Sequence, residues 1–382
     1  MKISRNWLND YIQLDLPTPE LIDTLNRIGM LVDSWEDLGH DVVLEIETYA
    51  NRPDTLGHLG IARELSAALG VPQKENAWPL IEIEEEIGDV FDIQIMDEEL
   101  CPRYCGKIVR GVEVGPSPAW LQERLAAVGL SSINNVVDVT NYVLYATAQP
   151  IHAFDLNKLE GEKILVRRAK KNEALRTLEG VDVSLTSDML VIADGKKPVA
   201  LAGIIGGEDS AVTLKTRDIL IECATFDPVS VRQTWKKLAM PTDASYRFER
   251  GTDISFPPLA AKMAASLLCQ MGGEVLKGTL DVYPKMRKPR MVVLRHHRIT
   301  DLLGVEVKSD FVVNTLTCLD MNAESQQPGI WQVKVPTFRV DIEREADLIE
   351  EIARFYGYEN IPSQLPAFQT EDVRIDPERA LH

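Results

Sequence analysis

A single carboxylate interrupts an apolar segment in the middle of the chain. Glu222 lies within Ile219-Leu-Ile-Glu-Cys-Ala224, a composition that predicts a buried strand. A carboxylate taken out of water needs hydrogen-bond donors, because its desolvation is otherwise uncompensated. Glu222 is therefore either tied to the local backbone or placed to accept a bond from a ligand, and the pattern by itself favours the structural role.

Three other segments carry residue types that binding sites use. His152 stands among apolar residues, where a histidine is most often a hydrogen-bonded core or turn residue. Thr242 opens the segment Thr-Asp-Ala-Ser, which has the composition of a helix N-cap. The glycines between Gly203 and Gly207 allow the backbone to approach a ligand closely, although a tight turn is the commoner reason for such a run.

Four carboxylates gather near the C-terminal end of the sequence, at Asp341, Asp347, Glu350 and Glu351. The last three are spaced i, i+3 and i+4, so a helix places them on one flank, beside an apolar stripe that includes Leu348 and Ile352. Carboxylate oxygens without His or Cys suit a hard cation such as Mg²⁺. A solvated acidic flank with Arg354 as its ion-pair partner explains the pattern equally well.

Standard catalytic signatures are absent from the sequence. It has no G-x-S-x-G, P-loop lysine, H-E-x-x-H or paired Cys-x-x-Cys motif. The five cysteines are scattered and odd in number, and Cys101 and Cys105 lack a second ligand pair for zinc. These features predict a reducing, cytoplasmic setting. No apolar run approaches the ~20 residues of a membrane span, so we expect no membrane partner.

The net charge of −18 over 382 residues is concentrated in two windows. Residues 75–99 hold ten acids and no base, and residues 341–351 hold six acids and one base. The acidic alternation in the first window predicts half-buried strands with a solvated face. A charge of −18 excludes a strongly basic, independent nucleic-acid binder, but the nearly neutral remainder is compatible with an RNA end.

The expected elements form separate helical and strand-rich runs, which predicts a multi-domain α+β protein. Helices are expected at 118–128, 228–238 and 257–271, and strands at 164–167, 189–193 and 219–223. Two prolines and four bases without periodicity mark residues 283–290 as a linker. A small helix–strand module follows, up to about residue 362.

Several motifs, in this order, together resemble one family: the β subunit of bacterial phenylalanyl-tRNA synthetase. They extend over residues 1 to about 365 and comprise Met1-Lys-Ile-Ser-Arg-Asn-Trp-Leu, Asn51-Arg-Pro-Asp-Thr-Leu-Gly-His, Asn135-Val-Val-Asp-Val-Thr-Asn-Tyr, Gln149-Pro-Ile-His-Ala-Phe-Asp, Ala200-Leu-Ala-Gly-Ile-Ile-Gly-Gly, Thr242-Asp-Ala-Ser-Tyr-Arg-Phe-Glu-Arg-Gly and Asp347-Leu-Ile-Glu-Glu-Ile-Ala-Arg-Phe-Tyr-Gly-Tyr. The resemblance implies a central mixed α/β editing domain (B3/B4) and a small, winged-helix-like B5 domain. The expected division is an N-terminal scaffold at 1–95, the editing domain at 96–280, a linker at 281–290, B5 at 291–362 and the start of a further region at 363–382.

The resemblance also implies site residues. The family's editing pocket, which hydrolyses tyrosine mischarged onto phenylalanine tRNA, maps onto His152, Glu222, Thr242 and Ala244, with the glycine run as pocket wall. Glu222 would accept the tyrosine hydroxyl, the one group that distinguishes Tyr from Phe. His152 would orient the ester or the attacking water.

The family further implies Mg²⁺ held by Asp341, Asp347, Glu350 and Glu351 together with the α subunit, in an α2β2 assembly that binds tRNA(Phe). Aminoacylation itself would belong to the α subunit. A non-catalytic scaffold with a vestigial editing pocket is the alternative. Two departures from relatives are expected to affect tRNA binding: a missing OB-type insert before Asn51, and Ser131 where relatives often carry Arg.

Overall fold

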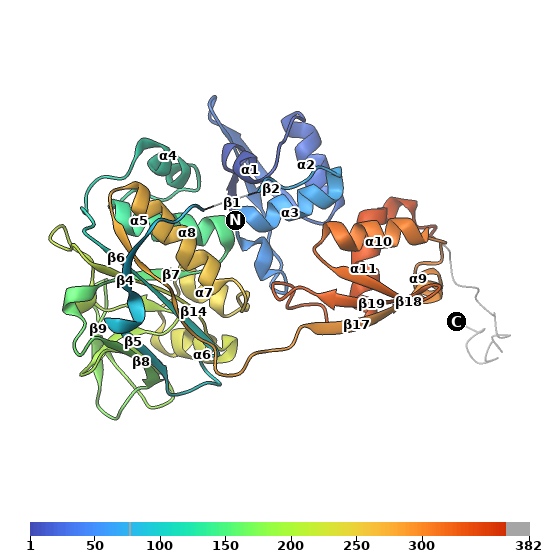
Figure 1. Cartoon of the computed structure of the whole chain (residues 1–382). Helices are drawn as coiled ribbons and strands as arrows, with labels where there is room; N and C mark the ends of the chain where they lie inside the picture. Colours follow the sequence, from blue (N-terminus) through green and yellow to red (C-terminus); the bar gives the residue numbers. More distant parts are fainter. Residues whose placement is uncertain (76–77, 364–382) are drawn as a thin grey trace, which may run out of the picture.

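The computed structural model describes residues 1–75 and 78–363, arranged in three modules (Figure 1). We call them the N-terminal module (residues 1–75), the two-sheet module (82–282) and the C-terminal module (290–363). The N-terminal module, in blue, lies between the other two. No helix in the described ranges is long and apolar enough to cross a membrane.

The N-terminal module packs three helices beside a small antiparallel sheet of order β1-β3-β2. Its elements are β1 (Lys2–Ser4), α1 (Arg5–Tyr11), α2 (Thr18–Arg27), β2 (Val32–Asp37), β3 (Val42–Ile46), η1 (Pro53–Leu56) and α3 (His58–Leu69). Ser4 caps α1 by accepting a bond from the Trp7 amide, and Gly70 ends α3 in the left-handed conformation that favours glycine. β2 and β3 are joined directly as a hairpin, at the place where the OB-type insert of relatives was expected to be missing.

The two-sheet module begins with strands and helices that cover residues 82–147. These are β4 (Glu82–Glu86), η2 (Ile87–Asp89), β5 (Asp92–Ile95), β6 (Arg103–Arg110), α4 (Ala119–Ala127) and α5 (Asn135–Thr147). Its middle part is mostly strands: β7 (Ile151–Asp155), η3 (Leu156–Lys158), β8 (Lys163–Arg168), β9 (Ala174–Arg176), β10 (Asp182–Ser184), β11 (Leu190–Ala193), β12 (Pro198–Leu201), β13 (Ile205–Gly206), η4 (Glu208–Ser210) and β14 (Ile219–Thr225). It closes with α6 (Pro228–Leu238), α7 (Asp243–Phe248), α8 (Pro257–Gln270), β15 (Glu274–Lys277) and β16 (Leu280–Val282).

Two sheets pack face to face in this module. One has the order β4-β15-β6-β14-β7, with β16 beside β6, and the other has the order β13-β12-β11-β8-β5. β14 explains why the layers form: Ile219, Ile221 and Cys223 point to α5 and α8, whereas Leu220 and Ala224 point to the core between the sheets. Glu222 has the same parity as Leu220, so its carboxylate faces the inter-sheet layer.

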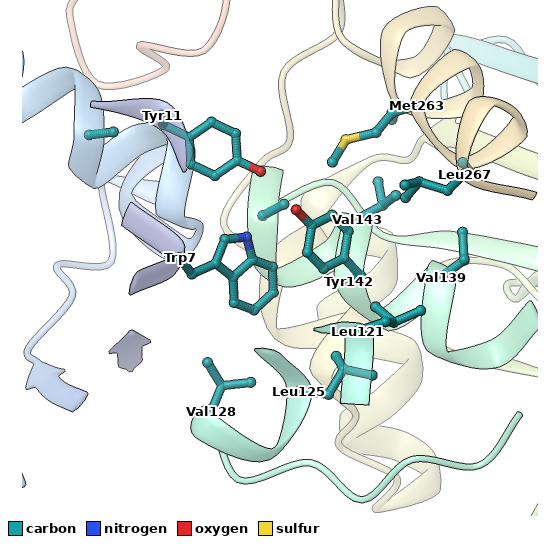
Figure 2. Close-up of a cluster of buried hydrophobic side chains, with 14 of the residues drawn as sticks. Trp7, Tyr11, Leu121, Leu125, Val128, Val139, Tyr142, Val143, Met263 and Leu267 are labelled. Atoms are coloured by element: carbon teal, nitrogen blue, oxygen red, sulfur yellow. The ribbon is translucent and has the colours of Figure 1, made fainter. Parts of the chain in front are cut away.

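One continuous core joins the N-terminal module to the helices of the two-sheet module. The Trp7 ring stacks on Tyr142 of α5 at 4.6 Å (Figure 2). It also stacks on His58 at 4.0 Å. His58 is itself buried, accepting a bond from the Ser4 amide and donating one to the carbonyl of Tyr145. These contacts fix the first helix against a segment more than a hundred residues later.

The C-terminal module has a three-stranded sheet of order β17-β19-β18 covered by three helices, consistent with the winged-helix-like arrangement expected. Its elements are β17 (Arg290–Arg295), α9 (His296–Leu303), α10 (Ser309–Cys318), β18 (Asn322–Gln327), β19 (Ile330–Val335), α11 (Glu345–Tyr356) and η5 (Tyr358–Asn360). Most of the region predicted at 363–382 lies outside the described residues.

The structure places two segment boundaries differently from the sequence prediction. β4 and β5, assigned to an N-terminal scaffold ending at residue 95, pair with β15 and β8 and so belong to the two-sheet module. β16 pairs with β6, which moves the start of the linker from 281 to 283. The alternating pattern identified these strands as half-buried, but a pattern does not name a strand's partner.

Candidate functional site

A pocket opens where the inter-sheet layer meets α7. It encloses about 410 Å³ of space between atoms and is lined by Pro150, Ile151, His152, Ile192, Ala200, Leu201, Gly203, Ile204, Ile205, Gly206, Glu222, Ala244 and Phe248. Most of these side chains are apolar, and two of them, His152 and Glu222, carry titratable groups. An apolar wall with few polar groups is the usual composition of a small-molecule site.

Glu222 and His152 are direct cross-strand neighbours. β14 and β7 pair antiparallel with Glu222 opposite His152, so both side chains emerge on the same face of the sheet. The His152 ring meets Phe154 edge-on at 4.5 Å, and its Nε2 atom is buried with no partner among the described residues. The strand register therefore places the Glu222 carboxyl and the His152 imidazole side by side in the pocket.

The Glu222 carboxyl has no ion-pair or hydrogen-bond partner in the described part of the chain, although Glu222 is only 6% exposed. Burial raises its pKa to about 8. Burial also lowers the pKa of His152 to about 4. At neutral pH both groups are therefore mostly uncharged. Glu222 can donate one hydrogen bond through its O–H and still accept at its oxygens, and His152 keeps one nitrogen as an acceptor. The interpretation of Glu222 as bonded to local backbone is wrong.

Thr242 acts through the backbone at the edge of the pocket. Its hydroxyl accepts a bond from the Ser245 amide at 3.0 Å and donates one to the carbonyl of Ile204 at 2.9 Å. The Ser245 hydroxyl accepts a bond from the Thr242 amide, which completes a capping box at the start of α7. The expected N-cap is confirmed, and the Thr242 hydroxyl also fixes α7 to the turn between β12 and β13, which lines the pocket.

Of the four editing residues expected from the resemblance, three line the pocket: His152, Glu222 and Ala244. Thr242 is not among the lining residues; as the N-cap of α7, it holds the helix that carries Ala244. Glycine is required at Gly206, because a Cβ there would lie 2.6 Å from Cε1 of His152. The glycine run is thus part of the wall, as the resemblance implied.

The apolar part of the lining was not predicted. Ile151, Ile204, Ile205 and Phe248 look in the sequence like any other core residue, because apolar residues on strands and helices are the common material of every core. A usable signal was present at Phe248, which lies four residues after Ala244 and therefore shares a helix face with it.

Glu351 of α11 takes part in a buried ion-pair network. Arg354 pairs with Glu351 and, at 2.8 Å, with Glu64 of α3, and Arg339 pairs with Glu351 at 2.7 Å and with Asp341. Burial by itself would raise the pKa of Glu351, but the guanidinium groups of Arg354 and Arg339 outweigh it and hold the pKa well below its usual range.

The four predicted Mg²⁺ ligands do not form one site within the described residues, which contain no group of three or more His, Cys, Asp or Glu arranged to hold a metal. Asp341 accepts two bonds from Arg339, and Asp347 accepts bonds from the amides of Glu343 and Arg344 at the start of α11. Glu350 is exposed on the outer flank. The residues of this chain do not fit a closed four-carboxylate site, and magnesium shared with a partner stays a prediction.

Two family models match consecutive parts of the chain. The B3/4 domain matches residues 100–273, and the tRNA synthetase B5 domain matches residues 292–358. The pocket lies in the first range and α11 in the second. The fold and the matched domains thus define a component of an aminoacyl-tRNA synthetase.

Individual relatives narrow the class. The chain is 45% identical to the phenylalanine–tRNA ligase β subunit of Geobacter metallireducens, over 85% of this chain and 41% of that protein. It is 40% identical to the phenylalanine–tRNA ligase β subunit of Rhodopirellula baltica, over 98% of this chain and 56% of that protein. The chain belongs to the phenylalanine–tRNA ligase β-subunit family and spans about half the length of these curated relatives.

A solved structure agrees on the fold. The crystal structure of an N-terminal fragment of the phenylalanyl-tRNA synthetase β subunit from Pyrococcus horikoshii matches with a TM-score of 0.52, covering 93% of this chain and 99% of that chain. The sequence identity is 17%, so this match concerns the arrangement of elements rather than the site.

Proposed function

We propose that the pocket hydrolyses tyrosine from mischarged Tyr-tRNA(Phe), and that the chain does so as part of a phenylalanine–tRNA ligase. The observation that carries the proposal is a buried carboxyl, without a partner among the described residues, in a mostly apolar pocket. The apolar wall accepts an aromatic ring, and Glu222 supplies the one polar contact that a tyrosine hydroxyl would make. A phenylalanine ring would leave that carboxyl unpaired, so the pocket would favour tyrosine.

The reaction needs water at the ester carbonyl. The unprotonated nitrogen of His152 lies on the same face as Glu222 and can accept a hydrogen bond from that water or hold the ester. Its lowered pKa keeps it an acceptor at neutral pH, although it makes His152 a weak base. We assign His152 to orienting the water, and Ala244 and Gly206 to shaping the space around the ring.

The assembly around this activity is part of the proposal. The matched B5 domain and the family's β-subunit name support an α-subunit partner, tRNA(Phe) as the RNA, and a cytoplasmic setting. Aminoacylation would then take place in the α subunit, with Mg²⁺ near α11 bound only when that partner completes the ligand set.

The test is deacylation of Tyr-tRNA(Phe) by the purified chain and by its complex with the α subunit. Glu222→Ala should slow Tyr-tRNA(Phe) clearance by at least about tenfold, the cost of losing a buried hydrogen bond to the substrate. Glu324→Ala, an exposed acid on β18, is the matched control and should leave the rate unchanged. Clearance at the wild-type rate by Glu222→Ala would contradict the assignment. Equal persistence of Tyr-tRNA and Phe-tRNA with the wild-type protein, beside tight α binding, would favour the scaffold alternative.

A further inference from the structure

A second hollow lies across α7 from the pocket. It is an open hollow of about 770 Å³, part of it bulk solvent, between the N-terminal module and the two-sheet module, and we call it the Tyr246 groove. Its lining residues are Met1, Lys2, Thr48, Leu56, Val128, Tyr145, Asp243, Tyr246 and Arg247. α7 separates the two hollows: Ala244 and Phe248 face the pocket, whereas Tyr246 and Arg247 face the groove.

The groove contains a buried cation whose hydrogen bonds are incomplete. Arg247 is only 3% exposed, and its Nε–H has no acceptor among the residues that the structure describes. Its other nitrogens donate to the carbonyls of Asp243 and Leu56, and its one acidic neighbour, the Asp243 carboxylate, lies 3.4 Å away and is largely exposed. Lys2 adds a second, exposed positive charge. An anionic ligand would complete this donor set.

Two aromatic rings line the same groove. Tyr246 is 41% exposed, and the guanidinium of Arg250 lies 3.5 Å from its ring centroid, which fixes the ring and covers one face. Tyr145 lies under the Arg247 guanidinium at 4.8 Å, and its hydroxyl donates to Asp243. Proteins bind single-stranded nucleic acid with aromatic rings that lie beside cations. The bases stack on the rings, and the phosphates pair with the cations.

We propose that the Tyr246 groove binds the unpaired 3′ strand of the aminoacylated RNA whose terminal amino-acid ester enters the pocket. The proposal rests on the proposed function, because it places the strand that such a substrate must carry. Tyr246 offers its open face to a base, and Lys2 and Arg247 face the phosphates. The Asp243 carboxylate, already bonded to Tyr145 and Arg247, is the one acidic group in the lining.

The experiment compares two substrates: Tyr-tRNA(Phe), which carries the 3′ strand, and tyrosyl-adenosine, which lacks it. In the whole chain, Tyr246→Ala should raise KM for Tyr-tRNA(Phe) about tenfold. Lys2→Ala should also raise this KM, and neither variant should change kcat. Hydrolysis of tyrosyl-adenosine, which lacks the preceding nucleotides, should be unaffected. Tyr358→Ala (a tyrosine 55% exposed in the C-terminal module) and Lys262→Ala (an exposed lysine of α8) are matched controls. An unchanged KM for Tyr-tRNA(Phe), or an equal loss on both substrates, would overturn the proposal.

A binding measurement separates this proposal from the proposed function. Fluorescence anisotropy with a short single-stranded RNA ending in CCA should show about tenfold weaker binding by Tyr246→Ala and a salt slope reduced by about one in Lys2→Ala. If the wild-type protein hydrolyses neither substrate but binds this RNA through Tyr246, the proposed function fails and the groove stands. Tighter binding of an acidic peptide than of the RNA would overturn the groove assignment.

Discussion

At the scale of single residues, the pocket is defined by a buried carboxyl that has no hydrogen-bond or ion-pair partner among the described residues. Glu222 has the desolvation of a core residue and none of the bonds that normally compensate it in the described chain. Such a group costs stability that a ligand can return, because a donor that enters the pocket supplies a hydrogen bond that burial has removed. The same burial raises the pKa of Glu222, so the stability of the protein should depend on pH through this residue.

The free energy of unfolding should fall as pH rises through the window set by Glu222. The pKa of a glutamate is about 4.5 when unfolded and about 8 here, so between these values the folded state holds a proton that the unfolded state has lost. The full effect is at most about 5 kcal/mol. Glu222→Gln has no charge to develop, so it should match the wild-type stability near pH 5 and exceed it near pH 8.5. Denaturant unfolding at both pH values measures this, and parallel pH profiles for the two proteins would contradict it.

Substitution of Gly206 should impair hydrolysis while the protein stays folded. A Cβ there would lie 2.6 Å and 2.7 Å from Cε1 and Nε2 of His152, so Gly206→Ala must displace the imidazole. We expect Tyr-tRNA(Phe) hydrolysis to fall at least about tenfold and unfolding free energy to fall by about 1–3 kcal/mol, as for an overpacked site. Gly88→Ala, where a Cβ meets nothing within 4 Å, should change neither. Hydrolysis by Gly206→Ala at the wild-type rate would show that His152 does not act on the substrate.

The sequence predicted the polar residues of the pocket but not its apolar lining. Glu222 and His152 stood out because a polar side chain inside an apolar run is unusual, and the family resemblance then placed both in one pocket. Their mutual position depends on the register between β7 and β14, which are separated by more than sixty residues. A register over that distance is decided by packing in three dimensions, so spacing in the sequence could not supply it.

At the scale of elements, α7 is the partition between pocket and groove, and one threonine holds it in place. The helix has only six residues, too few to be stable without tertiary support. Thr242 supplies that support twice, as N-cap and as donor to the Ile204 carbonyl across the pocket. The position of Ala244 on one side and of Tyr246 on the other therefore depends on this hydroxyl.

Thr242→Ala should destabilise the protein by about 1–2 kcal/mol, the cost of a lost cap and a lost second bond. It should also slow hydrolysis, because α7 loses its link to the turn between β12 and β13. Thr242→Ser keeps the hydroxyl and should restore both properties nearly to wild type. Thermal unfolding and Tyr-tRNA(Phe) deacylation are the measurements, and equal behaviour of the serine and alanine variants would show that the hydroxyl has no role.

The same scale shows why some elements were predictable. The helix at Pro228–Leu238 has the predicted limits, since Asp227 caps it and proline suits its first turn. The acidic strand β4 was recognised by its alternation, but the cations that neutralise it come from elsewhere: Lys107 and Arg110 on β6 pair with Glu82 and Glu85. Local chemistry determines where an element ends, whereas pairing between distant strands determines what it lies beside.

At the scale of the whole molecule, a buried ionic network joins the N-terminal and C-terminal modules. Glu64 of α3 connects Arg52 of the N-terminal module to Arg354 of α11. Arg354 also donates to the carbonyl of Ile28 at 2.6 Å. Because these groups are almost fully buried, each depends on the others for its solvation, and the removal of one leaves charges unpaired.

Arg354→Met should therefore cost about 3 kcal/mol or more of unfolding free energy, since Glu64 and Glu351 both lose a partner. The C-terminal module should also detach from the N-terminal module, so trypsin should cleave the already exposed segment 283–289 between the modules faster. Arg298→Met, at an exposed pair with Asp301, is the matched control and should cost less than about 1 kcal/mol. Unfolding that is identical in the two variants would show that the network contributes nothing to the contact between modules.

The interleaving of early and late segments has a consequence for synthesis on the ribosome. Trp7 is covered only when Tyr142 has been made, and β4 pairs with a strand that begins at residue 274. At about 5–20 residues per second, the first apolar surfaces of the nascent chain wait on the order of tens of seconds for their partners. The N-terminal module thus completes its packing late. During translation its exposed tryptophan, and the unpaired β4 of the two-sheet module, are a natural target for chaperones.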